Sequence, residues 1–90
     1  GVDLGGANLS GADLTRAQLR NADLFRTRLS GAKLVEIDLR SANLSNASLK
    51  ATDLTGADLH DADLTGADLS DANLSGAAIT EEQIAKALRL

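Results

Sequence analysis

The sequence contains no cysteine, and this absence removes several kinds of chemistry at once. Without thiols there is no disulfide framework, no thiolate nucleophile and no cysteine zinc site, and the redox compartment stays open. Tryptophan and tyrosine are also missing, which leaves Phe25 as the only aromatic residue. Because nucleic-acid-binding proteins usually combine a basic stripe with stacking aromatic side chains, we expect no direct binding of nucleic acid.

Long apolar runs are missing as well. No stretch approaches the roughly 18 apolar residues of a membrane-spanning helix, and no basic segment followed by an apolar one marks a signal peptide. We therefore expect a soluble chain without membrane contact, and with no targeting signal the cytoplasm is the default compartment. The chain also has no starting methionine, which favours the interpretation that it was cut from a longer protein.

Charge is unevenly distributed along the chain. Nine Lys and Arg residues against thirteen Asp and Glu residues give a net charge of −4. Residues 1–45 carry six basic and five acidic side chains, whereas residues 46–90 carry three and eight. The acidity therefore lies in the second half of a chain that is long enough for one domain only.

A strict five-residue repeat runs through almost the whole chain. An aliphatic residue stands at every fifth position without one insertion, which makes sixteen units. The series is Leu4, Leu9, Leu14, Leu19, Leu24, Leu29, Leu34, Leu39, Leu44, Leu49, Leu54, Leu59, Leu64, Leu69, Leu74 and Ile79. Two residues before each of these stands Ala in twelve units, and Val2, Thr27, Ile37 or Thr52 in the others. Each unit therefore has two inward positions.

Neither a helix nor a straight strand can bury such a repeat. On an α-helix a step of five residues moves about 140° around the axis, so the leucines would cover every face. Along a straight strand an odd step sends successive leucines to opposite faces. Asp or Asn directly precedes the Leu in eleven units, and small polar residues follow it, so each unit carries turn formers. We predict short extended segments that all turn the same way and stack about 4.8 Å apart.

The tandem motif A-[DN]-L-x-x over residues 2–79 resembles the pentapeptide-repeat proteins. The resemblance implies an all-β solenoid, a right-handed quadrilateral β-helix with four pentapeptides in each coil. It also implies that the Leu and the residue two before it point inward and that the other three point outward. Residues 1–79 would then form a domain of about four coils, roughly 19 Å tall at about 4.8 Å for each coil.

The last eleven residues, TEEQIAKALRL, leave the repeat. Ile84, Ala87 and Leu88 have the spacing of an amphipathic helix, and Thr80 with Gln83 fits a capping box. We predict a C-terminal capping helix over residues 80–90 that covers the last coil. At the other end the repeat begins in register at Val2, so we expect either upstream sequence or an end-to-end homodimer to cover the first coil.

No residues form a recognisable catalytic, cofactor or metal site. Asp53, Asp58, Asp63 and Asp68 invite a metal or acid–base interpretation, but Asx side chains at turns bond to nearby backbone in every unit, with or without a ligand. His60 is the only histidine, and we expect it to be solvated. No nucleophile with a nearby base and no phosphate-binding glycine loop is present. We therefore predict a protein that is not an enzyme and binds no cofactor or metal.

One stretch departs from the small, polar outer pattern. Phe25 and Val35 follow a Leu, where the resemblance implies outward side chains, and Arg26 and Arg28 lie close by in the sequence. Phe25, Arg26, Arg28 and Val35 are therefore the candidate partner surface. Single exposed apolar residues are also common on monomers, so simple tolerance remains the alternative.

Two functions compete at this point. The first is a non-catalytic structural scaffold or protein–protein interaction module with an unknown protein partner. The second is an acidic mimic of DNA, of the kind that some pentapeptide-repeat proteins direct against DNA gyrase. DNA carries one charge per about 1.7 Å of axis, so a rod of this height would need on the order of eleven net negative charges. The chain has a net charge of −4, which favours the scaffold or interaction module.

Overall fold

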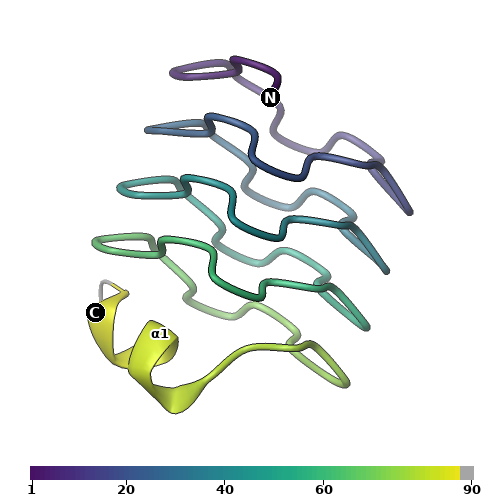
Figure 1. Cartoon of the computed structure of the whole chain (residues 1–90). Coiled ribbons are helices and arrows are strands. Elements are labelled where there is room, and N and C mark those ends of the chain that lie inside the picture. Colours follow the sequence, from purple (N-terminus) through teal and green to yellow (C-terminus); the bar gives the residue numbers. More distant parts are fainter. Residues whose placement is uncertain (88–90) are drawn as a thin grey trace.

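The computed structural model describes residues 1–87, which form a stack of coils with one short helix at the C-terminal end (Figure 1). Twelve parallel β-bridges hold the stack together, and each of them joins a residue to the one twenty positions later. The series runs from Asp3 with Asp23 to Asp58 with Ala78. One coil therefore takes twenty residues, or four pentapeptides, as the resemblance to the pentapeptide-repeat proteins implied.

Each side of a coil contributes one bridged residue, and the corners between sides are tight turns. Within residues 1–87 the β structure consequently consists of isolated bridges and includes no longer strand. In the first corner the N–H of Ala7 donates to the carbonyl of Leu4 at 3.0 Å, and the same bond recurs along the chain. The third residue of these turns has a positive φ, for example Gly31 at 71° and Ala51 at 59°. Positive φ at the third residue alone is the mark of a type II turn.

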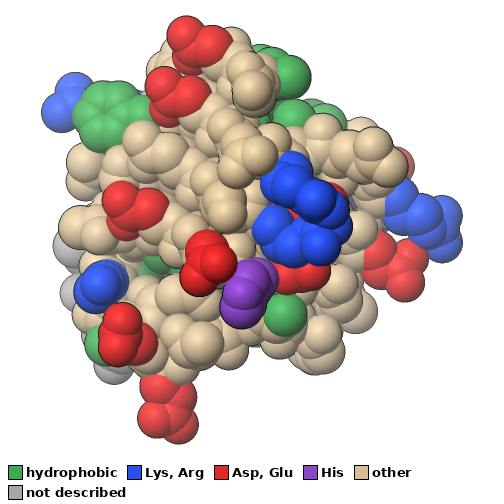
Figure 2. All heavy atoms as spheres, viewed as in Figure 1, with side chains coloured by type: hydrophobic (Ala, Val, Ile, Leu, Met, Phe, Trp, Pro, Cys, Tyr) green, Lys and Arg blue, Asp and Glu red, His purple; other side chains and the backbone are tan. Residues whose placement is uncertain are grey.

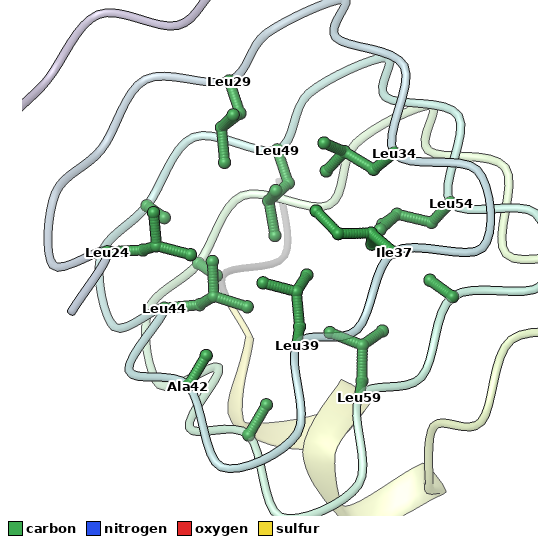
Figure 3. Close-up of a cluster of buried hydrophobic side chains, with 14 of the residues drawn as sticks. Leu24, Leu29, Leu34, Ile37, Leu39, Ala42, Leu44, Leu49, Leu54 and Leu59 are labelled. Atoms are coloured by element: carbon green, nitrogen blue, oxygen red, sulfur yellow. The ribbon is translucent and has the colours of Figure 1, made fainter. Parts of the chain in front are cut away.

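The leucines form the core. From Leu24 to Leu64 every Leu of the repeat is 0 or 1% exposed. Figure 3 shows Leu24, Leu29, Leu34 and Leu39 pointing inward from the four sides of one coil, with the next coil's leucines behind them. The two inward threonines are also buried and satisfied: Thr27 Oγ1 donates to Leu4 O and Thr52 Oγ1 donates to Leu49 O, both at 2.8 Å. The predicted inward positions are therefore confirmed from Ala22 to Ala67, whereas Val2, which was also predicted to point inward, is 51% exposed at the start of the first coil.

The two end coils bury their leucines less completely. In the first coil Leu4, Leu9, Leu14 and Leu19 are only partly buried. In the last coil Leu64 is 1% exposed, but the leucines of the second and third sides and Ile79 of the fourth are partly exposed. The leucine layers are therefore best shielded in the middle of the stack, where a coil lies above and below.

Helix α1 spans Glu81–Lys86 and is shorter than the range 80–90 that the sequence pattern predicted. Its capping box is present: the N–H of Gln83 donates to Thr80 Oγ1 at 3.1 Å, and the N–H of Thr80 donates to Gln83 Oε1 at 2.8 Å. Ala87 already has extended backbone. The carbonyl of Lys86, the last residue of the helix, accepts a bond from the Gly66 N–H of the last coil at 2.9 Å. Leu88 of the predicted apolar stripe lies outside the described residues.

Candidate interaction surface

The Asp and Asn residues that precede the leucines all perform the same structural task. In all eleven units the side-chain Oδ1 accepts a hydrogen bond from the N–H two residues later, at 2.9–3.2 Å. The acceptors are Asp3, Asn8, Asp13, Asp23, Asp38, Asn43, Asp53, Asp58, Asp63, Asp68 and Asn73. This is the Asx turn expected from the sequence, and it leaves these side chains committed to the backbone.

Several of the aspartates also accept a bond from a neighbouring hydroxyl. Thr15 Oγ1 donates to Asp13 Oδ1 at 2.6 Å, and Asp53 receives the same contact from Thr55. These hydroxyl and backbone donors favour the ionised form and lower the pKa of Asp13 and Asp53 below the ordinary value. The pKa of Asp63 is lowered likewise, first by the backbone N–H and then by the hydroxyl of Thr65. Such carboxylates are acceptors near neutral pH and hold no proton to donate.

The histidine lies at the foot of a ladder of ion pairs on the fourth side of the coils. Arg40 contacts Asp38 Oδ2 at 2.8 Å and Asp58 Oδ2 at 3.5 Å, and thereby joins the second coil to the third. His60 Nε2 lies 3.4 Å from Asp61 Oδ2, and both side chains are more than 70% exposed, so His60 is solvated as predicted. Figure 2 shows basic side chains grouped above the histidine on this face. Among residues 1–87 no three His, Asp or Glu side chains are arranged to hold a metal ion.

Phe25 and Arg26 form the most prominent irregular feature of the surface. Phe25 is 38% exposed, and the guanidinium carbon of Arg26 lies 5.2 Å from the centroid of its ring, which is a cation–π contact. Arg28 is exposed on the adjoining side, where its backbone bridges to Asn8 and Ser48. Within residues 1–87 neither arginine takes part in an ion pair. Phe25, Arg26 and Arg28 therefore follow one another along one corner and the side after it, and the two arginines make no ion pair with the residues that the structure describes.

Val35 does not join this surface. Ten residues are half of a twenty-residue coil, so Phe25 belongs to the first side and Val35 to the third. Figure 3 shows the residues directly before them, Leu24 and Leu34, entering the core from opposite sides. Val35 is also partly buried. Nearness in the sequence suggested that Val35 and Phe25 share one patch, but the four-sided coil places them on opposite sides.

Sequence reasoning missed one polar contact at the C-terminal end. A shallow hollow between α1 and the coils is lined by His60, Asp63, Glu82, Gln83 and Lys86 among others. In it Gln83 Nε2 donates to Leu59 O at 2.6 Å and to Ala62 O at 3.0 Å. The capping-box pattern had singled out Gln83 for its position in the helix, but it carried no sign of this second contact.

A family model described as pentapeptide repeats, in eight copies, matches residues 3–40, 22–61 and 42–80. The chain belongs to the pentapeptide-repeat family. The structural neighbours are pentapeptide-repeat proteins as well, whose fold is a right-handed quadrilateral β-helix. Members of this family are generally structural repeat proteins without enzymatic activity. No curated protein matches the chain.

Two solved structures illustrate the similarity. A pentapeptide-repeat protein from the thylakoid lumen of Arabidopsis thaliana is 32% identical over 89% of this chain, with a TM-score of 0.62. The protein Rfr23 from the cyanobacterium Cyanothece 51142 is 37% identical over 88% of this chain, with a TM-score of 0.51. The matches cover 59% and 57% of those two chains, so this pentapeptide-repeat chain corresponds to only part of each. Within residues 1–87 the structure has no helix that is long and apolar enough to cross a membrane.

Proposed function

We propose that this pentapeptide-repeat protein is a non-catalytic scaffold that binds a protein partner through its outer surface. The observation that carries the proposal is the surface formed by Phe25, Arg26 and Arg28. Elsewhere the outward Asx side chains are engaged by the backbone, and the fourth side pairs its own charges. A rigid stack that holds one protruding aromatic residue and two available arginines supports a role in protein recognition.

The chemistry of this surface indicates the kind of partner. Aromatic and arginine side chains are enriched among the residues that contribute most to protein–protein binding. Phe25 offers an apolar contact, while Arg26 and Arg28 offer donors that suit carboxylates. We therefore propose a partner with an apolar recess bordered by acidic side chains. Since Val35 lies on the third side, it falls outside the contact made by this partner.

Capture experiments with matched variants test this surface. Phe25→Ser and Arg28→Asp should each lose a partner that the parent protein captures, because one removes the apolar contact and the other reverses a charge. Val35→Ser is the control, since it makes the same kind of change on the opposite side. Retention of the partner by both Phe25→Ser and Arg28→Asp would refute the surface, and equal loss by Val35→Ser would show a general effect on folding.

The alternative is an acidic mimic of DNA that acts on DNA gyrase. One observation favours it: Asp3, Asp23 and Asp63 lie along one side of the stack, with Asn43 in the same column. Against it, Arg20 and Arg40 interleave with the aspartates of the fourth side, and Figure 2 shows basic side chains among the acidic ones. A gyrase supercoiling assay decides, because a mimic inhibits supercoiling at low concentration and a scaffold leaves it unchanged.

The ends of the solenoid supply a second proposed role. We assign residues 1–79 to the repeat domain and residues 80–90 to a cap, of which α1 is the described part. The partly buried leucines of the first coil support an end-to-end homodimer through that coil. Sedimentation equilibrium should then show a dimer that becomes a folded monomer with Leu9→Lys. A monomer at every concentration would exclude this contact.

A further inference from the structure

Gln83 occupies the position that a fifth coil would use to bond to the fourth. On the first side of each coil, the inward residue that stands two positions before the Leu has a carbonyl that faces the next coil. This carbonyl accepts a hydrogen bond from the N–H of the residue twenty-one positions later. Asp23 N donates to Val2 O at 2.8 Å, and Asn43 N donates to Ala22 O at 2.9 Å. The next carbonyls in this series are Ala42 O, which accepts from Asp63 N at 2.9 Å, and then Ala62 O. The same spacing would make the N–H of residue 83 the donor to Ala62 O. Residue 83 is Gln83, and it does donate to this carbonyl, but with its side-chain Nε2 in place of its backbone N–H.

A second bond is similar but is shifted by one residue. The N–H of Gly6 donates to the carbonyl of Phe25, nineteen residues later, at 2.8 Å, whereas the N–H of Gly66 donates to the carbonyl of Lys86 in α1, twenty residues later, at 2.9 Å. Leu64, directly below, is buried to 1% exposure. Helix α1 thus bonds to two of the backbone groups that a further coil would use on this side, without keeping the backbone pattern of a coil, and Figure 1 shows it at the end of the stack opposite the N-terminus.

The remaining three sides of the last coil are less well covered. Their aliphatic residues Leu69, Leu74 and Ile79 are partly exposed. What fits on such a surface is another pentapeptide coil, because each coil of this chain already stacks on a similar coil through parallel bridges. The first coil of a second copy presents the same twenty-residue outline, with Leu4 and Leu9 also partly exposed.

Helix α1 and such a copy cannot be bound together. Stacked residues are twenty positions apart, and the chain has four coils, so a docked second copy would continue the numbering from residue 81. Residues 2–6 of the second copy would therefore take the positions now filled by residues 82–86. These positions belong to α1. A coil can therefore dock in register only after α1 has left the first side.

We propose that Gln83 anchors α1 to the last coil and thereby prevents that coil from binding the first coil of a second copy. Once the anchor is lost, the contact joins unlike ends of two molecules. This contact uses the first coil, so it competes with the dimer proposed above. Where the head-to-tail contact forms, it does not close on itself and continues to add copies. Gln83 is a positioning residue in this proposal, since it acts by holding the helix in place.

The test uses the full 90-residue chain with two variants and one control. Gln83→Glu keeps the acceptor of the capping box but loses the donors to Leu59 O and Ala62 O. Gln83→Met keeps the size and loses both functions. Lys86→Met is the control, because the Lys86 side chain makes only an exposed contact to Glu82 at 3.8 Å while its carbonyl still accepts from Gly66.

Two readouts follow the two steps. Amide exchange at Gly66 reports the docking of α1, and Gly56, whose N–H donates to Ser75 O, is the internal reference. Exchange is measured with Leu9→Lys in the background, so that no second copy can bond to the Gly66 N–H in place of α1. Under this condition exchange at Gly66 should accelerate by at least about tenfold in both Gln83 variants and stay unchanged at Gly56. In sedimentation velocity the parent and Lys86→Met should not exceed a dimer, whereas both Gln83 variants should form larger species. Adding Leu9→Lys to Gln83→Glu should abolish those species.

Three results overturn the proposal. Unchanged exchange at Gly66 would show that Gln83 does not anchor α1. Faster exchange without species above a dimer would show that α1 does not block docking. Large species that persist with Leu9→Lys would show that the first coil is not the occupant. If both Gln83 variants fail to fold, then Gln83 is required for the coil itself and the proposal is wrong.

Discussion

The corner formed by Gly11, Gly31, Ala51 and Asp71 allows a reciprocal test of the turn type. Each residue stands third in its turn and has a positive φ, 71° at Gly31 and 59° at Ala51. Gly31 and Ala51 lie in consecutive coils, so their surroundings are closely matched. Gly31→Ala and Ala51→Gly should therefore change stability in opposite directions. A Cβ on Gly31 would meet no other atom within 4 Å, which leaves the backbone conformation as the cause.

The size of the effect follows from two opposing terms. A residue with a Cβ costs about 1–2 kcal/mol in the left-handed region relative to glycine. Glycine loses about 0.4–1 kcal/mol more backbone entropy on folding than alanine does. The difference predicts that Ala51→Gly stabilises the protein by about 0.5–1 kcal/mol and that Gly31→Ala destabilises it by about the same amount. For a domain of this size that corresponds to roughly 2–8 °C in Tm.

Thermal melts followed by circular dichroism measure these shifts. Lys50→Gly is the control for Ala51→Gly, because Lys50 is exposed and precedes it in the same turn without a positive φ. This control should lower the Tm, since it adds glycine entropy and relieves no strain. A lower Tm for Ala51→Gly, or an unchanged Tm for Gly31→Ala, would refute the type II assignment of this corner.

The remaining predictions concern the core, the Asx turns and one crowded glycine. Leu44→Ala should cost about 2–5 kcal/mol as a buried cavity, and Leu44→Asp should unfold the domain, so a circular-dichroism melt that matches the parent would contradict the inward placement. The pKa of Asp53 is lower in the folded state than in the unfolded chain. Asp53 therefore stabilises the fold above about pH 4, near its pKa in the unfolded chain, and this stabilisation is lost as the pH falls further. Asp53→Asn keeps the acceptor, so its Tm should drop less than that of the parent between pH 7 and pH 3, and an equal drop would exclude this role. Gly66→Ala should lower the Tm more than Gly31→Ala, since its Cβ would also collide with Asn46 Oδ1, and an equal effect would show that Asn46 moves away freely.

Most of the fold could be predicted from the sequence because the repeat makes every coil a copy of its neighbours. Leu44 is buried for the same reason as Leu24 or Leu64, so one pattern applied sixteen times defines the whole interior. The Asx bonds are equally local, since each joins a side chain to an N–H two residues away, as Asp53 does with Thr55. Interactions of such short range depend on the order of residues within one unit, which the sequence displays directly.

The tertiary structure decided which of the irregular residues lie together. Phe25, Arg26 and Arg28 follow one another around a single corner, whereas the four-sided cross-section places Val35 on the opposite side. It also decided that α1 ends at Lys86 and that Gln83 bonds to Leu59 and Ala62. Phe25 and Val35 are ten positions apart, and the bonds of Gln83 span 24 and 21 positions. A five-residue motif has no period that records such separations. The motif alone therefore determined how each unit folds, and the stacking of twenty-residue coils determined which units meet.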